Sequence, residues 1–509
     1  MVKKSRTNQK VKNFSKGYNS ENFTEENYSV KSTADLNFNN LKNVLMTNKY
    51  AWMLIFLTFA GFVLRFYNLG FNSIWLDEGS TINFAQRSLS GIWEATIGGG
   101  EFNPPLFYYL EHFMLTFGES EVTLRFLPAL FGALCIPIMY FIGREAVDEK
   151  SGIIAAALMT FSSFQIFYSQ DARAYTTVLF FFSVALICYL WALKNNNIKW
   201  WILFGLFSAI SFWTHFYIVI AVGIIFLHAI YTNRNEIREN ISNIKPVLAA
   251  FAIFTIITIP IIIATITLFF KRAAGGETWG LKGIDVITTT FVQISGGNVM
   301  ITLIFGLLAL AGGYKIFTMK RDLAVLIGLS LILPFIASFI LSAAIPMSPR
   351  YLIYLLPFYF MAIAGSVKYL PESYNSEKIA ALAIVIILLL NLPALMPYYT
   401  TYSKNDWRGF STALESVTNE GDKVVLLPGY MHQPFDYYYD NETDRTEVYQ
   451  YYTKEELNVL SEENPNSTIY YVVTGDIMSA DPTGGSLQWL EQNAVSSGQH
   501  TGIYVFKSK

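Results

Sequence analysis

Long apolar blocks alternate with short polar stretches from residue 50 to residue 398. Most of these blocks have the roughly 17 to 25 residues that a helix needs to cross about 30 Å of hydrocarbon. The pattern therefore predicts about eleven transmembrane helices. The predicted spans are 50–69, 122–143, 151–169, 173–193, 198–213, 215–232, 246–269, 299–317, 323–344, 351–367 and 378–398.

The pattern changes on either side of this region. Residues 1–48 are polar, rich in Asn, Ser and Lys, and lack apolar periodicity, which predicts a disordered tail. After Tyr399 the β-branched runs Lys423–Leu427 and Thr468–Val473 predict strands, and Trp407–Val417 predicts a helix. The chain thus divides into a tail (1–48), a transmembrane domain (49–398) and a small C-terminal α/β domain (399–509).

Composition agrees with a polytopic all-α membrane bundle. The chain is 53% hydrophobic and only 15% charged, which is too apolar for a soluble domain of 509 residues. Its net charge of −2 argues against a nucleic-acid partner, whose phosphates require a basic face. Cys135 and Cys188 both lie within apolar blocks, so neither a disulfide framework nor a zinc site is predicted.

The distribution of Lys and Arg sets the predicted orientation. The N-terminal tail is basic and should be cytoplasmic by the positive-inside rule. The segment 104–117 is short and contains Glu111 and His112, which suits an interfacial helix. If it does not cross, the later basic loops also face the cytoplasm, and the C-terminal domain is extracytoplasmic. The low cysteine count and the lack of eukaryotic retrieval signals favour a prokaryotic, including archaeal, cell membrane.

The candidate chemistry centres on the first external loop, residues 70–121, and on the adjacent carboxylates of Asp77 and Glu78. Polar groups at the ends of several other spans should face the same side. An external end of the bundle that is lined with carboxylates and cations suits a site that holds an anion and moves a proton. These further groups are Asn103, Asp171, Arg173, His215, Lys271, Arg272, Arg350 and Tyr351.

Four motifs together resemble the membrane glycosyltransferases of C-type (GT-C) fold. They are Asp77-Glu78 in the first external loop, Asn103-Pro104-Pro105-Leu106, the turn from Tyr168 to Tyr175, and Arg350-Tyr351 before an apolar span. Within these enzymes the chain is most similar to the dolichyl-phosphate-mannose protein mannosyltransferase and aminoarabinose transferase group. The resemblance covers about residues 51–398, and it implies a GT-C-like bundle with interfacial helices.

The resemblance implies a sugar donor linked to a polyprenyl or dolichyl phosphate or diphosphate, and a protein, glycan or lipid acceptor, with membrane lipids around the bundle. Asp77 would be the general base toward the acceptor hydroxyl, and Glu78 would orient or polarise the site. The remaining groups would bind substrate or stabilise the leaving phosphate: Arg350, Arg173, Asp171, His215, Lys271, Arg272, Asn103 and Tyr351.

The sequence does not determine whether the reaction uses a cofactor. Some relatives use a divalent metal, Mg²⁺ or Mn²⁺, and Asp77 with Asp171 would then be ligands; other relatives imply no cofactor.

Other interpretations are also open. The acids can be solvated loop residues or a helix cap, Asp171 and Arg173 a structural ion pair, and Arg350 an interfacial anchor. A transporter or flippase of a lipid-linked or anionic solute is the rival function, and a non-catalytic membrane protein is a third. A transporter predicts ionisable residues at mid-membrane depth and paired broken helices, whereas the predicted spans are nearly free of charge.

Overall fold

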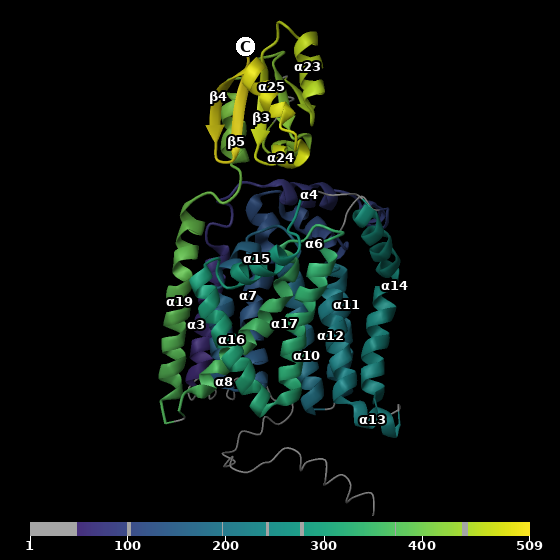
Figure 1. Ribbon diagram of the computed structural model, residues 1–509, viewed down its shortest axis with the longest axis vertical. Helices are drawn as coiled ribbons and strands as arrows, with labels where there is room; N and C mark the ends of the chain where they lie inside the picture. Colours follow the sequence, from purple (N-terminus) through teal and green to yellow (C-terminus); the bar gives the residue numbers. More distant parts are fainter. Residues whose placement is uncertain are drawn as a thin grey trace, which may run out of the picture. The chain divides into compact units, whose positions relative to one another are not determined.

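The computed structural model describes residues 48–98, 103–195, 197–240, 244–274, 279–371, 373–439 and 446–509. The predicted disordered tail, 1–48, therefore lies outside the described residues except for Asn48. Residues Trp52–Lys509 form one compact unit, and the fold below is that of this unit (Figure 1).

Apolar helices form a bundle that accounts for all eleven predicted spans. Among the described residues, eight helices are long and apolar enough to cross a membrane, or nine if one bent pair counts as a single span. α11 and α12, with 17 and 15 residues, are shorter apolar helices that occupy two of the predicted spans. The bundle helices are α3 (Lys49–Phe66), α7 (Glu121–Ala146), α8 (Glu149–Phe161), α9 (Ser163–Ser169), α10 (Tyr175–Asn195), α11 (Ile198–Thr214), α12 (Ile218–Thr232), α14 (Lys245–Ala274), α16 (Val299–Met319), α17 (Arg321–Leu341), η4 (Pro349–Leu355), α18 (Leu356–Gly365), η5 (Ser366–Tyr369) and α19 (Ser376–Thr400).

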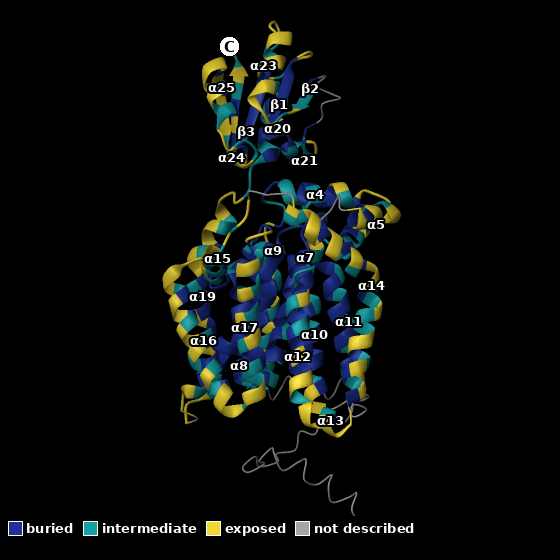
Figure 2. Ribbon diagram, turned by 45° about the vertical axis from the view of Figure 1, so that its right-hand side comes forward, coloured by how far each residue is buried: buried dark blue, intermediate teal, exposed yellow. Residues whose placement is uncertain are grey.

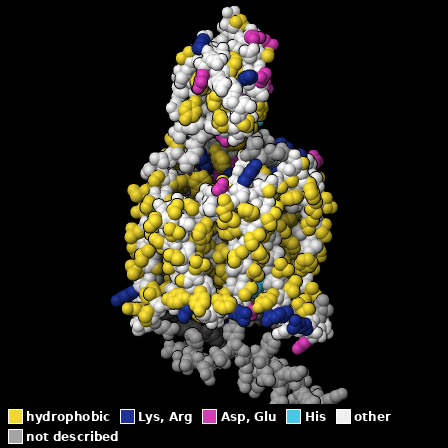
Figure 3. All heavy atoms as spheres, viewed as in Figure 1, with side chains coloured by type: hydrophobic (Ala, Val, Ile, Leu, Met, Phe, Trp, Pro, Cys, Tyr) yellow, Lys and Arg dark blue, Asp and Glu magenta, His cyan; other side chains and the backbone are white. Residues whose placement is uncertain are grey.

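The outer surface of this bundle is apolar. Phe59, Ile263 and Leu310 are 68%, 74% and 74% exposed, which is costly in water and favourable against lipid chains. Figure 3 shows hydrophobic side chains covering the sides of the bundle and Lys and Arg side chains gathered at the end that carries α13 (Arg234–Glu239). Figure 2 shows that α8 and α10 are buried within the bundle. The chain is therefore a multi-pass membrane protein.

One span is broken. α8 and α9 meet at Ser162 with a bend of 56°, which frees backbone carbonyls inside the bundle. Arg65 of α3 is fully buried and donates to the carbonyls of Met159, at 2.8 Å, and Thr160, at 3.2 Å. Backbone groups away from water need partners, so this buried arginine has a structural role at the break. No second bent pair of this kind occurs among the described residues, whereas a transporter is expected to contain paired broken helices.

Short helices lie between the spans. The segment predicted to be interfacial forms α6 (Leu106–Met114) and η2 (Leu115–Phe117), and nine helical residues are too few to cross the hydrocarbon core. α4 (Leu76–Ala85) and α5 (Leu89–Ile97) precede it in the first loop. α15 (Ile284–Ile294), which the sequence pattern did not predict, lies between α14 and α16.

The C-terminal domain contains a five-stranded sheet of order β2-β1-β3-β5-β4. β1 is parallel to β2 and β3, while β5 is antiparallel to β3 and β4. Apolar side chains pack on both faces of β1 and β3, which explains their continuous apolar runs. The elements are α20 (Trp407–Glu415), β1 (Lys423–Leu427), η6 (Gly429–Met431), α21 (His432–Phe435), β2 (Glu447–Gln450), α23 (Lys454–Glu463), β3 (Ile469–Thr474), α24 (Ile477–Ala480), α25 (Gly485–Asn493), β4 (Ala494–His500) and β5 (Ile503–Ser508).

Candidate active site

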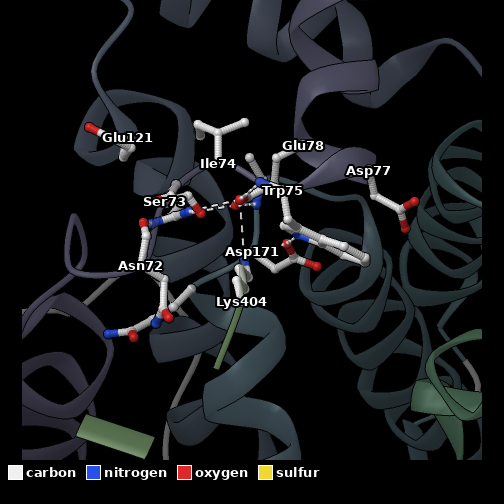
Figure 4. Close-up of polar contacts among 12 residues, drawn as sticks. Asn72, Ser73, Ile74, Trp75, Asp77, Glu78, Glu121, Asp171 and Lys404 are labelled. Atoms are coloured by element: carbon white, nitrogen blue, oxygen red, sulfur yellow. Dashed lines mark hydrogen bonds and ion pairs between the residues drawn. The ribbon is translucent and has the colours of Figure 1, made fainter. Parts of the chain in front are cut away.

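Asp77 and Glu78 lie in the first turn of α4, where the helix dipole favours negative charge. Successive side chains of a helix point about 100° apart around its axis. Figure 4 accordingly shows the two carboxylates pointing in different directions. Asp77 is 21% exposed, whereas Glu78 is fully buried. The adjacent acids therefore have different environments and different roles.

Glu78 is held by Arg125 of α7. Its Oε1 accepts from Arg125 Nε and its Oε2 from Arg125 Nη2, each at 2.7 Å. The other N–H groups of Arg125 donate to the carbonyls of Leu69, Asn72 and Ser73 at 2.8–3.0 Å. All five donors of this buried guanidinium are thus used, and the loop before α4 is fixed to α7.

The backbone N–H of Ala172 also donates to Glu78, at 2.9 Å. Burial opposes ionisation of this carboxyl, but the charges of Arg125 and Lys404 outweigh it and lower the pKa of Glu78 to about 2. Glu78 is therefore an anion at neutral pH that is fully engaged by partners. Such a carboxylate is suited to orient the site and unsuited to accept a proton.

Asp77 faces a cavity of about 140 Å³. Its Oδ2 lies 2.8 Å from Nη1 of Arg350, at the start of η4. Among the described residues, the buried Nε of Arg350 has no hydrogen-bond partner. The cavity is lined by Asp77, Asn103, Arg173, His215, Phe216, Tyr217, Arg272, Trp279, Arg350 and Tyr351. Three arginines against one carboxylate give it a net positive charge.

His215 occupies the turn between α11 and α12. Its Nδ1 accepts from the backbone N–H of Tyr217 at 3.4 Å, which places the ring proton on Nε2. Burial and the charges of Arg173, Arg350 and Arg272 lower the pKa of His215 to about 3, so the ring is neutral. The buried Nε2 has no hydrogen-bond partner within the described part of the chain. His215 thus presents an unused donor at the cavity.

Two further arginines complete the basic wall. Arg173 Nη1 donates to the carbonyl of Asp77 at 3.1 Å and to Thr81 Oγ1 at 3.2 Å, which ties the turn before α10 to α4. The guanidinium carbon of Arg272 lies 5.3 Å from the centre of the Trp279 ring. The backbone N–H of Leu281, two residues after Trp279, donates to the carbonyl of Met347 at 2.8 Å.

Aromatic rings surround the guanidinium of Arg350. Its guanidinium carbon lies 5.6 Å from the Trp75 ring, 5.5 Å from the Tyr175 ring and 5.8 Å from the Tyr351 ring. Tyr351 stacks on Tyr217 at 4.9 Å between ring centres. Each cation–π contact favours the charged guanidinium at this place.

The predicted residues separate into two groups. Seven of the ten lie together around the cavity: Asp77, Asn103, Arg173, His215, Arg272, Arg350 and Tyr351. Glu78 and Asp171 are buried beside the cavity, and Lys271 is exposed and does not line it. Arg272 follows Lys271 in the last turn of α14, and the helical rotation between them separates their side chains.

Asp171 has partners that the sequence did not suggest. Its Oδ1 lies 3.0 Å from Lys404 Nζ and accepts from Trp75 Nε1 at 2.7 Å. Among the described residues it forms no ion pair with Arg173, which bonds α4 instead. Lys404 was not a predicted site residue. It follows α19 in a short polar stretch, where no local motif distinguishes it from a solvated lysine.

Comparisons with known proteins agree with this architecture. Residues 103–264 match the family model described as dolichyl-phosphate-mannose-protein mannosyltransferase. A protein of Aquifex aeolicus (strain VF5), described as uncharacterized, is 30% identical over 135 residues. That match covers 25% of this chain and only 27% of the relative.

Solved structures match over most of the chain. ArnT from Cupriavidus metallidurans in the apo state superposes with a TM-score of 0.57 at 12% identity, covering 90% of this chain and 98% of that one. The same enzyme bound to undecaprenyl phosphate gives 0.53 at 12% identity, with the same coverage. The apo oligosaccharyltransferase of Archaeoglobus fulgidus gives 0.55 at 13% identity, covering 91% and 75%.

The predicted fold class is therefore confirmed: this chain has the GT-C fold, and its residues 103–264 resemble the mannosyltransferase family, as the sequence motifs indicated.

Proposed function

We propose that this chain with the GT-C fold is a membrane glycosyltransferase that moves a sugar from a polyprenyl-phosphate-linked donor to an acceptor hydroxyl, with Asp77 as the general base. The observation that carries the proposal is the cavity in which Asp77 lies 2.8 Å from Arg350 among two further arginines and a neutral histidine. A general base beside an anion site is the combination that this transfer requires.

The cavity has features of a site for a phosphate group. Arg350 Nε and His215 Nε2 are buried nitrogens without hydrogen-bond partners among the described residues, and both side chains line the cavity. Buried donors are normally satisfied, so an acceptor from outside the chain accounts for them. A phosphate supplies such oxygens, and ArnT has been solved with undecaprenyl phosphate bound.

The proposed reaction uses these groups in one displacement. The acceptor oxygen forms a bond to the anomeric carbon of the donor sugar, and the bond between that carbon and the phosphate oxygen breaks. The electron pair leaves with the phosphate, whose charge Arg350 and its neighbours stabilise. The acceptor proton passes to Asp77, whose side chain is 21% exposed and lines the cavity.

Asp77 and Asp171 do not fit the role of a shared metal site. Asp77 pairs with Arg350, and Asp171 is held by Lys404 and Trp75. A cation at each carboxylate opposes a second cation there. Among the described residues, no group of three or more His, Cys, Asp and Glu side chains is placed to hold a metal ion. The proposed reaction accordingly contains no metal step.

We further propose that Asp77, the cavity and the C-terminal domain lie outside the cell membrane, as the distribution of basic loops predicts. The acceptor would then be an extracytoplasmic protein, glycan or lipid.

The experiment is an incubation of purified protein with radiolabelled polyprenyl-phosphate sugars and candidate acceptors. Label should leave the lipid fraction with wild-type protein and not with Asp77→Asn. In sealed vesicles, movement of intact labelled lipid between leaflets without loss of the sugar would favour a flippase instead. Absence of both sugar release and transfer across a panel of donors contradicts the proposed function.

A further inference from the structure

Lys404 reaches the active site from the segment that joins the transmembrane domain to the C-terminal domain. Its side chain is only 6% exposed. The Nζ atom lies 3.1 Å from Glu78 Oε2 and 3.0 Å from Asp171 Oδ1, so one ammonium bridges two buried carboxylates. Figure 4 shows Lys404 among these side chains.

The same residues are linked to the proposed base through Trp75. The indole N–H of Trp75 donates to Asp171 Oδ1 at 2.7 Å, and Lys404 Nζ lies 5.5 Å from the centre of that ring. Arg350, which pairs with Asp77, lies 5.6 Å from the same ring. Lys404 and Asp171 therefore both contact the Trp75 side chain, whose ring Arg350 also approaches.

Charge balance depends on Lys404. Two anions, Glu78 and Asp171, face two cations, Arg125 and Lys404, and all four side chains are nearly inaccessible. Loss of one partner of a buried ion pair leaves an uncompensated charge. The pKa of Asp171 is already raised, because burial and nearby Glu78 outweigh the opposing charge of Lys404. Without Lys404, the pKa of Asp171 should therefore rise further.

The segment around Lys404 is fixed to the first loop. The backbone N–H of Ser403 donates to Asn72 Oδ1 at 2.8 Å, and Arg408 Nη2 donates to the carbonyl of Gly70 at 2.9 Å. Tyr438 of the C-terminal domain accepts from the backbone N–H of Ile74 at 2.8 Å. Contacts of the joining segment and the C-terminal domain with the loop that carries Asp77 therefore fix the position of Lys404.

We propose that Lys404 is a positioning residue for the transfer reaction: its ion pairs with Asp171 and Glu78 hold Asp171 in place, so that Asp171 fixes Trp75 and, through Trp75, the Arg350–Asp77 pair. The inference rests on the proposed function of that pair. Lys404 does not line the cavity, so its effect should fall on turnover and not on donor affinity.

The test compares Lys404→Met with Lys423→Met, a matched control in the C-terminal domain. Lys423 is similarly covered and pairs with Glu447 at 2.6 Å, without a contact to the site. Lys404→Met should lower kcat about 10- to 100-fold, with the donor KM within about twofold, since small displacements of catalytic groups cost this much. Lys423→Met should keep wild-type kcat. The proposal is overturned if kcat is equal in both variants, or if Lys404→Met raises the donor KM without lowering kcat.

A second measurement does not require activity. In Lys404→Met the midpoint of thermal unfolding in detergent should fall, relative to wild type, as pH rises through the raised pKa of Asp171, because the protonated form stabilises the folded state. Lys404→Met combined with Asp171→Asn should remove this dependence. If Lys404→Met follows the wild-type curve at every pH, the charge-balance argument is wrong. If wild-type protein transfers no sugar, the proposed function fails, while the unfolding curves still decide whether Lys404 balances Asp171.

Discussion

Asp77 Oδ2 and Arg350 Nη1 lie 2.8 Å apart, although 273 residues separate them in the chain. Asp77 lies in the first turn of α4 in the first loop, and Arg350 lies in the first turn of η4 before α18. Their pairing places a carboxylate and a cation side by side at the cavity, where each can be tested by substitution.

Asp77→Asn should lower turnover about 10²- to 10⁴-fold and leave donor affinity nearly unchanged, because the amide keeps the shape of the side chain but cannot accept the proton. Single-turnover rates and donor binding measure the two effects separately. Asp285→Asn, an exposed acid in the first turn of α15, is the control and should behave as wild type. A variant at Asp77 with near-full turnover removes it from the role of base.

Arg350→Ala should weaken donor binding about 10- to 150-fold, because one charge-assisted contact contributes about 1.5–3 kcal/mol. Turnover should fall as well, since the leaving phosphate loses positive charge nearby. Arg321→Ala, at the exposed start of α17, is the control and should keep wild-type donor binding. Unchanged donor binding would mean that Arg350 lies outside the phosphate site.

His215→Phe should weaken donor binding about 2- to 12-fold, the equivalent of one neutral hydrogen bond of about 0.5–1.5 kcal/mol. Because the pKa of His215 is lowered to about 3, the ratio of wild-type to variant affinity should be constant between about pH 5.5 and 8. Equilibrium binding of polyprenyl phosphate across that range measures it. A ratio that rises steeply below about pH 6.5 would show that the imidazolium is the binding form.

Glu78 should stabilise the fold in a pH-dependent way. Its pKa is lowered from 4.5 to about 2, so its contribution is fully present above about pH 4.5 and is lost as pH falls toward 2. The difference in unfolding midpoint between wild type and Glu78→Gln should therefore shrink over that interval. A difference that does not change with pH would indicate that the Arg125–Glu78 pair does not stabilise the ionised carboxylate.

Membrane orientation can be tested by cysteine labelling with an impermeant reagent in intact cells. Ser90 in the first turn of α5 and Ser416 after α20 are exposed, and Ser373 is exposed in the loop before α19, at the opposite end of that span. Cysteines at Ser90 and Ser416 should label and one at Ser373 should be protected. The buried natural cysteines, Cys135 and Cys188, are first replaced by Ala. Labelling of Ser373→Cys alone would invert the proposed orientation.

Apolar periodicity predicted the membrane bundle and the C-terminal α/β domain, because burial in lipid or between sheet and helix restricts each residue locally. It did not predict the break between α8 and α9. The cause is tertiary: the carbonyls freed at Met159 and Thr160 are satisfied by Arg65 from another helix. Helix α15 was not predicted either, because its eleven residues are too few for a membrane span.

The sequence by itself determined which polar groups gather at one end of the bundle, because the ends of alternate spans must share a side. Only the tertiary structure decided their partners. The helical rotation along α4 points the side chains of Asp77 and Glu78 in different directions. In the turn before α10, Asp171 pairs with Lys404 and not with nearby Arg173. Lys404 lies 233 residues from Asp171. Its burial depends on how the chain after α19 meets the first loop, and no local pattern in the sequence encodes that contact.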